Sequence, residues 1–210
     1  MKTPNAGITD RKLPTQNRSR ARVEKILKAA EELLLHNEIA DITTSSIAKK
    51  ANIPVGSVYQ YFKERDSVLI ALGQQVIQDI NEQLTAVFSD VSQHAHWRHV
   101  VRETLSAYMK IHQQDELYHR LNGALFNNKE WINLNHSMEQ QMIDFFSGYG
   151  LLDNRGFSDE QRQNIVRVIV VMCSSVVLRI KEPGLKDKAD SILTELQDAV
   201  IAYLSCKLGD

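Results

Sequence analysis

Apolar residues recur at every third or fourth position through most of the 210-residue chain, a spacing that predicts helices. The longer patterns cover residues 19–36, 66–88, 97–112, 115–127, 131–147, 158–181 and 187–207. No stretch alternates cleanly between apolar and polar positions, as a half-buried strand would. The β-branched run at 165–180 is long for a strand and fits a buried helix better. We therefore expect an all-α protein of about nine helices.

Two shorter helices are predicted between residues 40 and 62. Thr43 or Thr44 has the right side chain to cap the first, which we expect to end near Ala51. Pro54 stops that helix and suits the first turn of the next, which we expect to reach Phe62. A basic amphipathic helix, a short helix, a tight turn and a second short helix are typical of a helix-turn-helix DNA-binding domain.

The second short helix carries unusual residues for a helix that packs only on its own core. Gly56 costs a helix roughly 1 kcal/mol relative to alanine, but it lets a DNA backbone come close. Tyr59 and Tyr61 have hydroxyls that can donate to phosphate oxygens. Val58 and Phe62, four residues apart, share a face and can anchor the helix. The alternative is that both tyrosines are half-buried core residues.

The net charge of −1 is unevenly distributed. Residues 1–65 carry 12 Lys and Arg against 7 Asp and Glu, whereas residues 66–210 carry 13 against 19. A basic first third favours a polyanionic partner for that part of the chain. A chance imbalance on solvated faces is the alternative.

The first 18 residues show no apolar period and contain Pro14, so we expect a flexible basic arm that ends where the first helix begins. Its positive charges cluster near that junction, at Arg11, Lys12, Arg18 and Arg20. These side chains are candidates for contacts in the flanking minor groove of DNA. A tail without a defined contact is the alternative.

Several functional classes are disfavoured. The chain has no GxSxG, GxGxxG, P-loop or HExxH motif, so we expect neither an enzyme nor a cofactor. The histidine-rich segment at 94–99 lacks cysteine or acidic residues at ligand spacing, and we expect no metal site. Cys173 and Cys206 are too few for a disulfide framework, which favours a cytoplasmic location. Between Arg167 and Arg179 the most apolar run has only eleven uncharged residues, too few to span a membrane.

The helix-turn-helix segment resembles the TetR/AcrR family of transcriptional regulators. The family pattern is Thr-x-x-x-Ile-Ala-x-x-Ala-x-Val-x-x-Gly-x-Leu-Tyr-x-His-Phe-x-x-Lys-x-x-Leu. The matching positions are Thr43, Ile47, Ala48, Ala51, Ile53, Gly56, Val58, Tyr59, Tyr61, Phe62, Arg65 and Val68. Five of these are mild departures, with Ile53, Val58, Tyr61, Arg65 and Val68 replacing Val, Leu, His, Lys and Leu. The resemblance implies a DNA-binding domain at 19–65 and an effector-binding and dimerisation domain at 66–210.

The resemblance also implies site residues. Those expected to contact double-stranded operator DNA are Thr43, Ser45, Val55, Gly56, Ser57, Tyr59, Gln60, Tyr61 and Arg65. Candidates for a small-molecule effector pocket are Trp97, Tyr108, Met109, Phe126, Trp131, Met138, Met142, Phe145 and Phe146. Helices 158–181 and 187–207 are expected to form a homodimer interface, although both can also be central helices of a monomer. The expected function is a repressor released from a palindromic operator by a small apolar or amphipathic effector. A dimeric regulator without an effector, or an activator, is the alternative.

Overall fold

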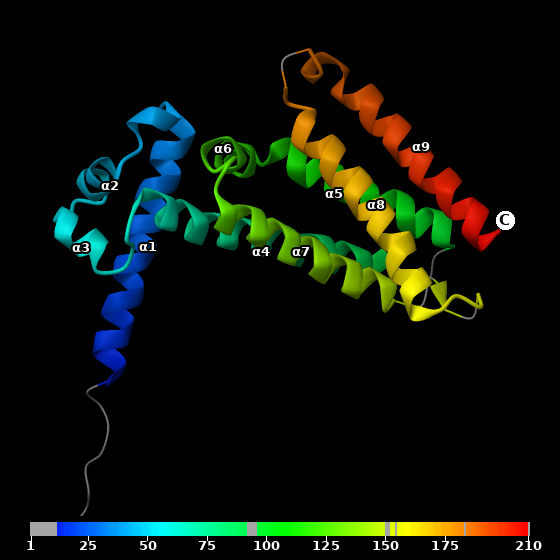
Figure 1. Cartoon of the computed structure of the whole chain (residues 1–210), viewed down its shortest axis with the longest axis horizontal. Helices are drawn as coiled ribbons and strands as arrows, with labels where there is room; N and C mark the ends of the chain where they lie inside the picture. The colour runs from blue at the N-terminus through cyan, green and yellow to red at the C-terminus, as the bar shows by residue number, and fades with distance from the viewer. Residues whose placement is uncertain (1–11, 92–95, 150–151, 154, 183, 210) are drawn as a thin grey trace, which may run out of the picture. The chain divides into compact units, whose positions relative to one another are not determined.

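The computed structural model describes residues 12–91, 96–149, 152–153, 155–182 and 184–209, and within these ranges every regular element is a helix (Figure 1). The α-helices are α1 (Lys12–His36), α2 (Thr44–Lys50), α3 (Val55–Tyr59), α4 (Arg65–Val91), α5 (Trp97–Gln114), α6 (Glu116–Ala124), α7 (Lys129–Ser147), α8 (Asp159–Arg179) and α9 (Ala189–Leu208). Short 3-10 turns, η1 (Ile39–Asp41) and η3 (Lys186–Lys188), lie between some of them. The predicted all-α fold is confirmed.

The chain divides after Leu72 into two compact units. The first unit holds α1, α2, α3 and the first two turns of α4, and the second holds the remainder of α4 and all later helices. Val68 and Leu69, in those first turns, are completely buried and belong to the first unit.

The first unit is built on a small aliphatic core. Ile26 and Leu34 of α1, Ile47 of α2 and Val58 of α3 are all completely buried, and α2 contacts both α1 and α3. Val58 thus anchors α3 as its spacing suggested.

The first helix begins at Lys12, seven residues before the predicted start at residue 19. Pro14 lies in its first turn, where a missing N–H costs nothing because the first N–H groups of a helix have no intrahelical acceptor. Residues 12–18 are accordingly helical and are not part of a flexible arm. Arg11 and the segment before it lie outside the described residues.

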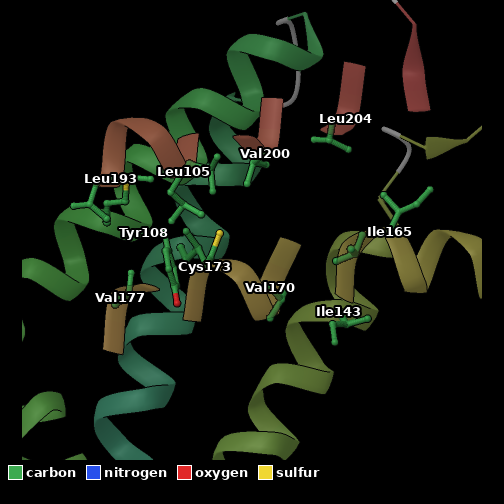
Figure 2. Packing of buried hydrophobic residues seen from close by; sticks show 14 of the residues in the cluster. Leu105, Tyr108, Ile143, Ile165, Val170, Cys173, Val177, Leu193, Val200 and Leu204 are labelled. Atoms are coloured by element: carbon green, nitrogen blue, oxygen red, sulfur yellow. The ribbon is translucent and has the colours of Figure 1, made fainter. Parts of the chain in front are cut away.

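The second unit has a larger core in which α5, α8 and α9 converge (Figure 2). Ser158 caps α8 through a reciprocal pair of hydrogen bonds with Gln161, so that this helix begins at Asp159. One face of α8 is buried among α7 and α9, but Val168, Val171 and Leu178 on the same helix remain exposed. No helix in the described part of the chain is both long enough and apolar enough to cross a membrane.

Candidate functional site

Two exposed regions of the first unit hold most of the predicted DNA-contact residues, and local hydrogen bonds explain their shape. Thr43 is the N-cap of α2, as predicted: its Oγ1 accepts the Ser46 N–H (3.0 Å), and the Thr43 N–H donates to Ser46 Oγ (2.8 Å). This capping box satisfies two amide groups that would otherwise lack partners at the helix start. Thr43 and Ser45 are exposed there.

The turn between α2 and α3 is fixed by two hydrogen bonds and one unusual backbone angle. The Asn52 N–H donates to Lys49 O (3.1 Å), and the Ile53 N–H reaches Ala48 O (3.0 Å), which together close the end of α2. Asn52 has φ of 51°, a left-handed conformation that asparagine tolerates better than most residues. Pro54 is extended and caps α3. The chain therefore reverses tightly enough to present α3 directly after α2.

The third helix is only five residues long and ends at Tyr59, three residues earlier than predicted. The N–H groups of Tyr61 and Phe62 both donate to Val58 O (3.0 Å each), so the chain closes into a turn there. Tyr59 is 55% exposed and Tyr61 is 38% exposed. Both tyrosines are therefore surface residues, and the alternative that they are half-buried core aromatics is wrong.

We call the set Thr43, Ser45, Val55, Gly56, Ser57, Tyr59, Gln60 and Tyr61 the α2–α3 surface; all are exposed except Ser57, which is half-buried. Gly56 is its most informative member. A Cβ added at Gly56 would meet no atom within 4 Å. No described residue therefore comes close enough to require glycine at that position.

Arg65 differs from the other predicted DNA contacts. Its guanidinium is engaged with the carboxylate of the next residue, with Nη2 and Nε at 2.6 and 2.8 Å from Asp66 Oδ1. Its side chain is only 31% exposed, so part of its charge is already offset within the chain. Lys50 is likewise paired with Glu32 at 2.8 Å, which lowers the pKa of that carboxyl. Lys49 and Lys63, which were not predicted as DNA contacts, are exposed.

A cavity of about 150 Å³ lies inside the second unit, walled by residues of α4 to α9. Four of the nine predicted pocket residues line it, namely Tyr108, Met138, Met142 and Phe146. Its other apolar lining comes mainly from aliphatic side chains of α4 and α8. These were not predicted, because aliphatic residues at helical spacing look like ordinary core.

The other five predicted pocket residues do not line this cavity. Trp97 is buried at the start of α5 beneath the Arg98 guanidinium, which lies 4.5 Å from the ring centroid. Met109 is buried in the core, and Phe126 is 76% exposed. Phe145 packs its ring edge-on against Phe88, with centroids 5.8 Å apart.

Trp131 is the fifth, and its position has a clear cause. Its Nε1–H donates to Asn122 Oδ1 (3.0 Å), which joins α7 to α6. Its ring occupies the space that a side chain at Gly73 of α4 would need, because a Cβ there would lie 2.2 Å from Trp131 Cζ3. Trp131 of α7 thus packs against α4 and hydrogen-bonds to α6, and it does not line the cavity.

One end of the cavity is polar. The Tyr118 hydroxyl donates to Asn135 Oδ1 (3.0 Å), and the His112 ring lies edge-on between Tyr108 and Tyr118, with centroids 4.5 and 5.2 Å away. His112 Nδ1 and Thr104 Oγ1 are buried and have no hydrogen-bond partner among the described residues. Such unpaired atoms are costly unless a water or a ligand satisfies them.

Titratable groups around the cavity are shifted toward their neutral forms. Burial, with smaller contributions from His119 and Lys181, lowers the pKa of His112 to about 4. Burial raises the pKa of the Cys173 thiol to about 12, so this sulfur is unreactive. Burial also raises the pKa of Tyr108 well above its usual range. The imidazole of His112 and the phenol of Tyr108 are therefore neutral near pH 7.

Stability should fall on acidification because of His112. Its folded pKa of about 4 lies below the ordinary value of 6.5, so between these pH values the unfolded chain binds a proton that the folded chain does not. The stabilisation is complete above pH 6.5 and is lost as the pH falls toward 4. We expect a loss of about 2 kcal/mol between pH 7 and pH 5, measurable by urea unfolding.

The variant His112→Gln should flatten that pH dependence, whatever its effect on absolute stability. The variant His136→Gln, at an exposed position on α7, is the matched control and should keep the wild-type dependence. Equal pH dependence in His112→Gln and wild type would contradict the assignment.

No group of three or more metal-ligating side chains is found in the part of the chain that the structure describes. His96 accepts the Arg98 N–H through Nδ1 (3.4 Å) at the start of α5, which is a capping role. His94 lies outside the described residues.

Part of the chain is similar in sequence to known proteins. Residues 26–72 match the model for bacterial regulatory proteins of the tetR family. The fatty acid metabolism regulator protein of Bacillus subtilis (strain 168) is 24% identical over 130 residues, which are 62% of this chain and 63% of that protein. The chain spans less than two thirds of the length of the curated relatives it matches.

Solved structures share the fold over most of the chain. A TetR-family transcriptional regulator from Streptomyces coelicolor superposes with a TM-score of 0.63 at 21% identity, over 89% of this chain and 99% of that one. The fatty acid degradation regulator of Bacillus halodurans superposes with a TM-score of 0.59 at 18% identity, over 86% of this chain and 94% of that one. Residues 26–72, which hold the capped α2, the five-residue α3 and the two exposed tyrosines, thus match bacterial regulatory proteins of the tetR family.

Proposed function

We propose that this protein is a homodimeric repressor that binds a palindromic operator through the α2–α3 surface and leaves it when a small molecule fills the cavity of the second unit. The observation that carries the DNA-binding surface is Gly56, an exposed glycine at which an added Cβ would find no atom of the chain within 4 Å. A close approach by a phosphate backbone explains why this position has no side chain.

The residues of the α2–α3 surface divide by chemistry. Thr43, Ser45 and Tyr59 have hydroxyls that suit phosphate oxygens, and such contacts set position more than sequence choice. Gln60 and Ser57 are the residue types that can hydrogen-bond to base edges in the major groove. The Arg65 guanidinium, already paired with Asp66, contributes less charge to DNA than the sequence alone suggests.

A dimer is supported by the exposed side of α8. The resemblance to the TetR/AcrR family also implies a homodimer. Val168, Val171 and Leu178 are each at least 40% exposed, and their spacing of three and seven places them on one face. Burying such residues against a second copy stabilises the pair, by roughly 1.5–3 kcal/mol for a fully buried valine or leucine. Two symmetric copies also match the symmetry of a palindromic operator.

The variant Val171→Glu should therefore dissociate the dimer. A buried charge without a partner costs several kcal/mol, so we expect the dimer dissociation constant to rise by at least about a hundredfold. Sedimentation velocity at micromolar concentration measures this change. Ile132→Glu is the matched control, since Ile132 is also branched and 40% exposed but lies on α7. A wild-type monomer, or a dimeric Val171→Glu variant, would refute this interface.

An effector is supported by the cost of the cavity. An unfilled volume of 150 Å³ destabilises a core by roughly 3–4 kcal/mol at about 24 cal/mol per Å³. The cavity is smaller than the several hundred Å³ usual for drug-sized ligands. It is comparable to an engineered core cavity that accepts benzene. Two similar proteins are named as regulators of fatty acid metabolism or degradation, which also supports a largely apolar effector.

The fourth helix, α4, can couple ligand binding to DNA affinity. It begins at Arg65, next to the α2–α3 surface in sequence, and its later turns line the cavity at Ile77 and Leu84. Trp131 fixes the same helix at Gly73. A ligand that shifts α4 changes the DNA affinity, and DNA then opposes ligand binding by the same factor.

The test is a selection of bound duplexes from a random DNA pool, carried out with the purified full chain. The proposal expects a palindrome to be enriched, with half-sites about one helical turn apart or a multiple of it. Enrichment of a single half-site, or of no sequence, would refute a dimeric sequence-specific regulator.

A further inference from the structure

The cavity has two chemically different ends, and this difference describes its ligand. One end is hydrocarbon, made by Leu84, Phe88, Phe146, Leu152, Ile165 and Leu204. The rings of Phe88 and Phe146 meet edge-on there, with centroids 4.9 Å apart. The other end holds the linked rings and amide described above, His112 with Tyr108, Tyr118 and Asn135. A ligand that fills this space has an apolar body and a polar head.

The polar end of the cavity carries negative charge and no positive side chain among the described residues. Among the described residues that line the cavity, Glu139 is the one charged side chain, and neither lysine nor arginine is present. Glu139 lies one helical turn after Asn135, on the same face of α7, and is half-buried. Its carboxylate acts on both buried phenols. It adds to burial, the Cys173 thiol and Tyr118 in raising the pKa of Tyr108, and it adds to burial in raising the pKa of Tyr118.

One cation, Lys181, acts electrostatically on His112 but does not line the cavity. Lys181 lines a smaller pocket on another side of His112, together with His119. It also interacts with the carboxylates of Glu116 and Asp115. The cavity itself therefore has negative charge, aromatic faces and an unpaired imidazole nitrogen at the same end.

Building on the proposed effector response, we propose that the cavity binds a lipophilic ammonium ion. The protonated amine lies at the polar end, where the Glu139 carboxylate balances its charge and the neutral His112 imidazole accepts an N–H at Nδ1. The faces of Tyr108 and Tyr118 attract a cation through their ring quadrupoles. The apolar body of the ligand replaces the empty volume beside Phe88 and Phe146.

A carboxylate ligand is disfavoured by the same groups. It would bring a second negative charge to Glu139, and the cavity wall offers it no cation among the described residues. Like charges that share a desolvated site repel each other strongly. Free fatty acids are therefore poor candidates for this cavity.

The test compares three probes with one phenethyl body and different heads: phenethylammonium, phenethyl alcohol and phenylpropanoate. Calorimetric titration of the full chain at pH 7 measures each affinity without DNA. We expect phenethylammonium to bind at least tenfold more tightly than the alcohol, and phenylpropanoate to bind most weakly. Tighter or equal binding of the alcohol or the acid, or no binding of any probe, overturns the proposal.

The variant Glu139→Gln should remove the preference, lowering phenethylammonium affinity at least tenfold and changing phenethyl alcohol affinity less than about twofold. Glu103→Gln, at an exposed position on α5 outside the cavity wall, is the control and should behave as wild type. Unchanged selectivity in Glu139→Gln also overturns the ammonium assignment. Because these titrations contain no DNA, a palindrome enriched in the DNA selection would still stand if they failed.

Discussion

Gly56→Ala should weaken specific DNA binding by at least about tenfold while leaving the protein folded. The new methyl group meets no atom of the chain within 4 Å, and alanine is a better helix former than glycine. Stability should therefore be unchanged or should rise by up to about 1 kcal/mol. At the DNA, the methyl group occupies the space into which a phosphate comes. Losing that approach should cost about 1.4–2.8 kcal/mol, a tenfold to hundredfold loss of affinity.

Two measurements separate these effects. Thermal unfolding followed by circular dichroism reports the fold, and fluorescence anisotropy with a selected duplex reports binding. Gln75→Ala changes an exposed position on α4 in the second unit and should alter neither. Wild-type affinity in Gly56→Ala would show that the α2–α3 surface does not meet DNA as proposed. An unfolded variant would show that Gly56 has a structural role.

Gly73→Ala should strongly destabilise the second unit. The added Cβ would lie 2.2 Å from Trp131 Cζ3 and 2.7 Å from Cη2, distances that force the indole to move. Trp131 is 2% exposed, and moving it breaks the hydrogen bond of its Nε1–H to Asn122. Overpacking and an unpaired buried donor each cost about 1–3 kcal/mol, against a gain of up to about 1 kcal/mol from helix propensity. We expect a net loss of about 3 kcal/mol in urea unfolding.

A double-mutant cycle tests the cause. Trp131→Leu alone leaves a cavity and should also destabilise, but combined with Gly73→Ala the total loss should be at least about 1 kcal/mol smaller than the sum. Gln74→Ala, the exposed neighbouring position, should have little effect. Strictly additive losses would contradict a direct contact between Gly73 and Trp131.

The fold of the first unit could be predicted from the sequence because its signals are local. The Thr43 cap and the Pro54 break each act within a few residues. The end of α3 was less predictable, since the turn that ends it uses the Val58 carbonyl twice and has no proline or glycine to mark it. The ion pair between Arg65 and Asp66 could have been predicted, because the two residues are adjacent in the sequence.

The cavity was harder to predict because helical spacing shows that a residue is apolar but not which neighbour it faces. Tyr108 and Trp131 are both aromatic residues at helical spacing. Tyr108 lines the cavity, whereas Trp131 fills the space beside Gly73. That difference depends on contacts between helices that are far apart along the chain. The polar end was equally hidden, because Tyr118, Asn135 and Glu139 are ordinary residues until α6 and α7 bring them together.

Hydrogen exchange measured by mass spectrometry, with and without a selected palindromic duplex, tests the central claim most directly. The account predicts that DNA slows exchange in the peptides covering residues 43–61, and that peptides from α8 and α9 are unaffected when the free protein is already dimeric. Unchanged exchange at 43–61, with protection on another surface, would contradict the account.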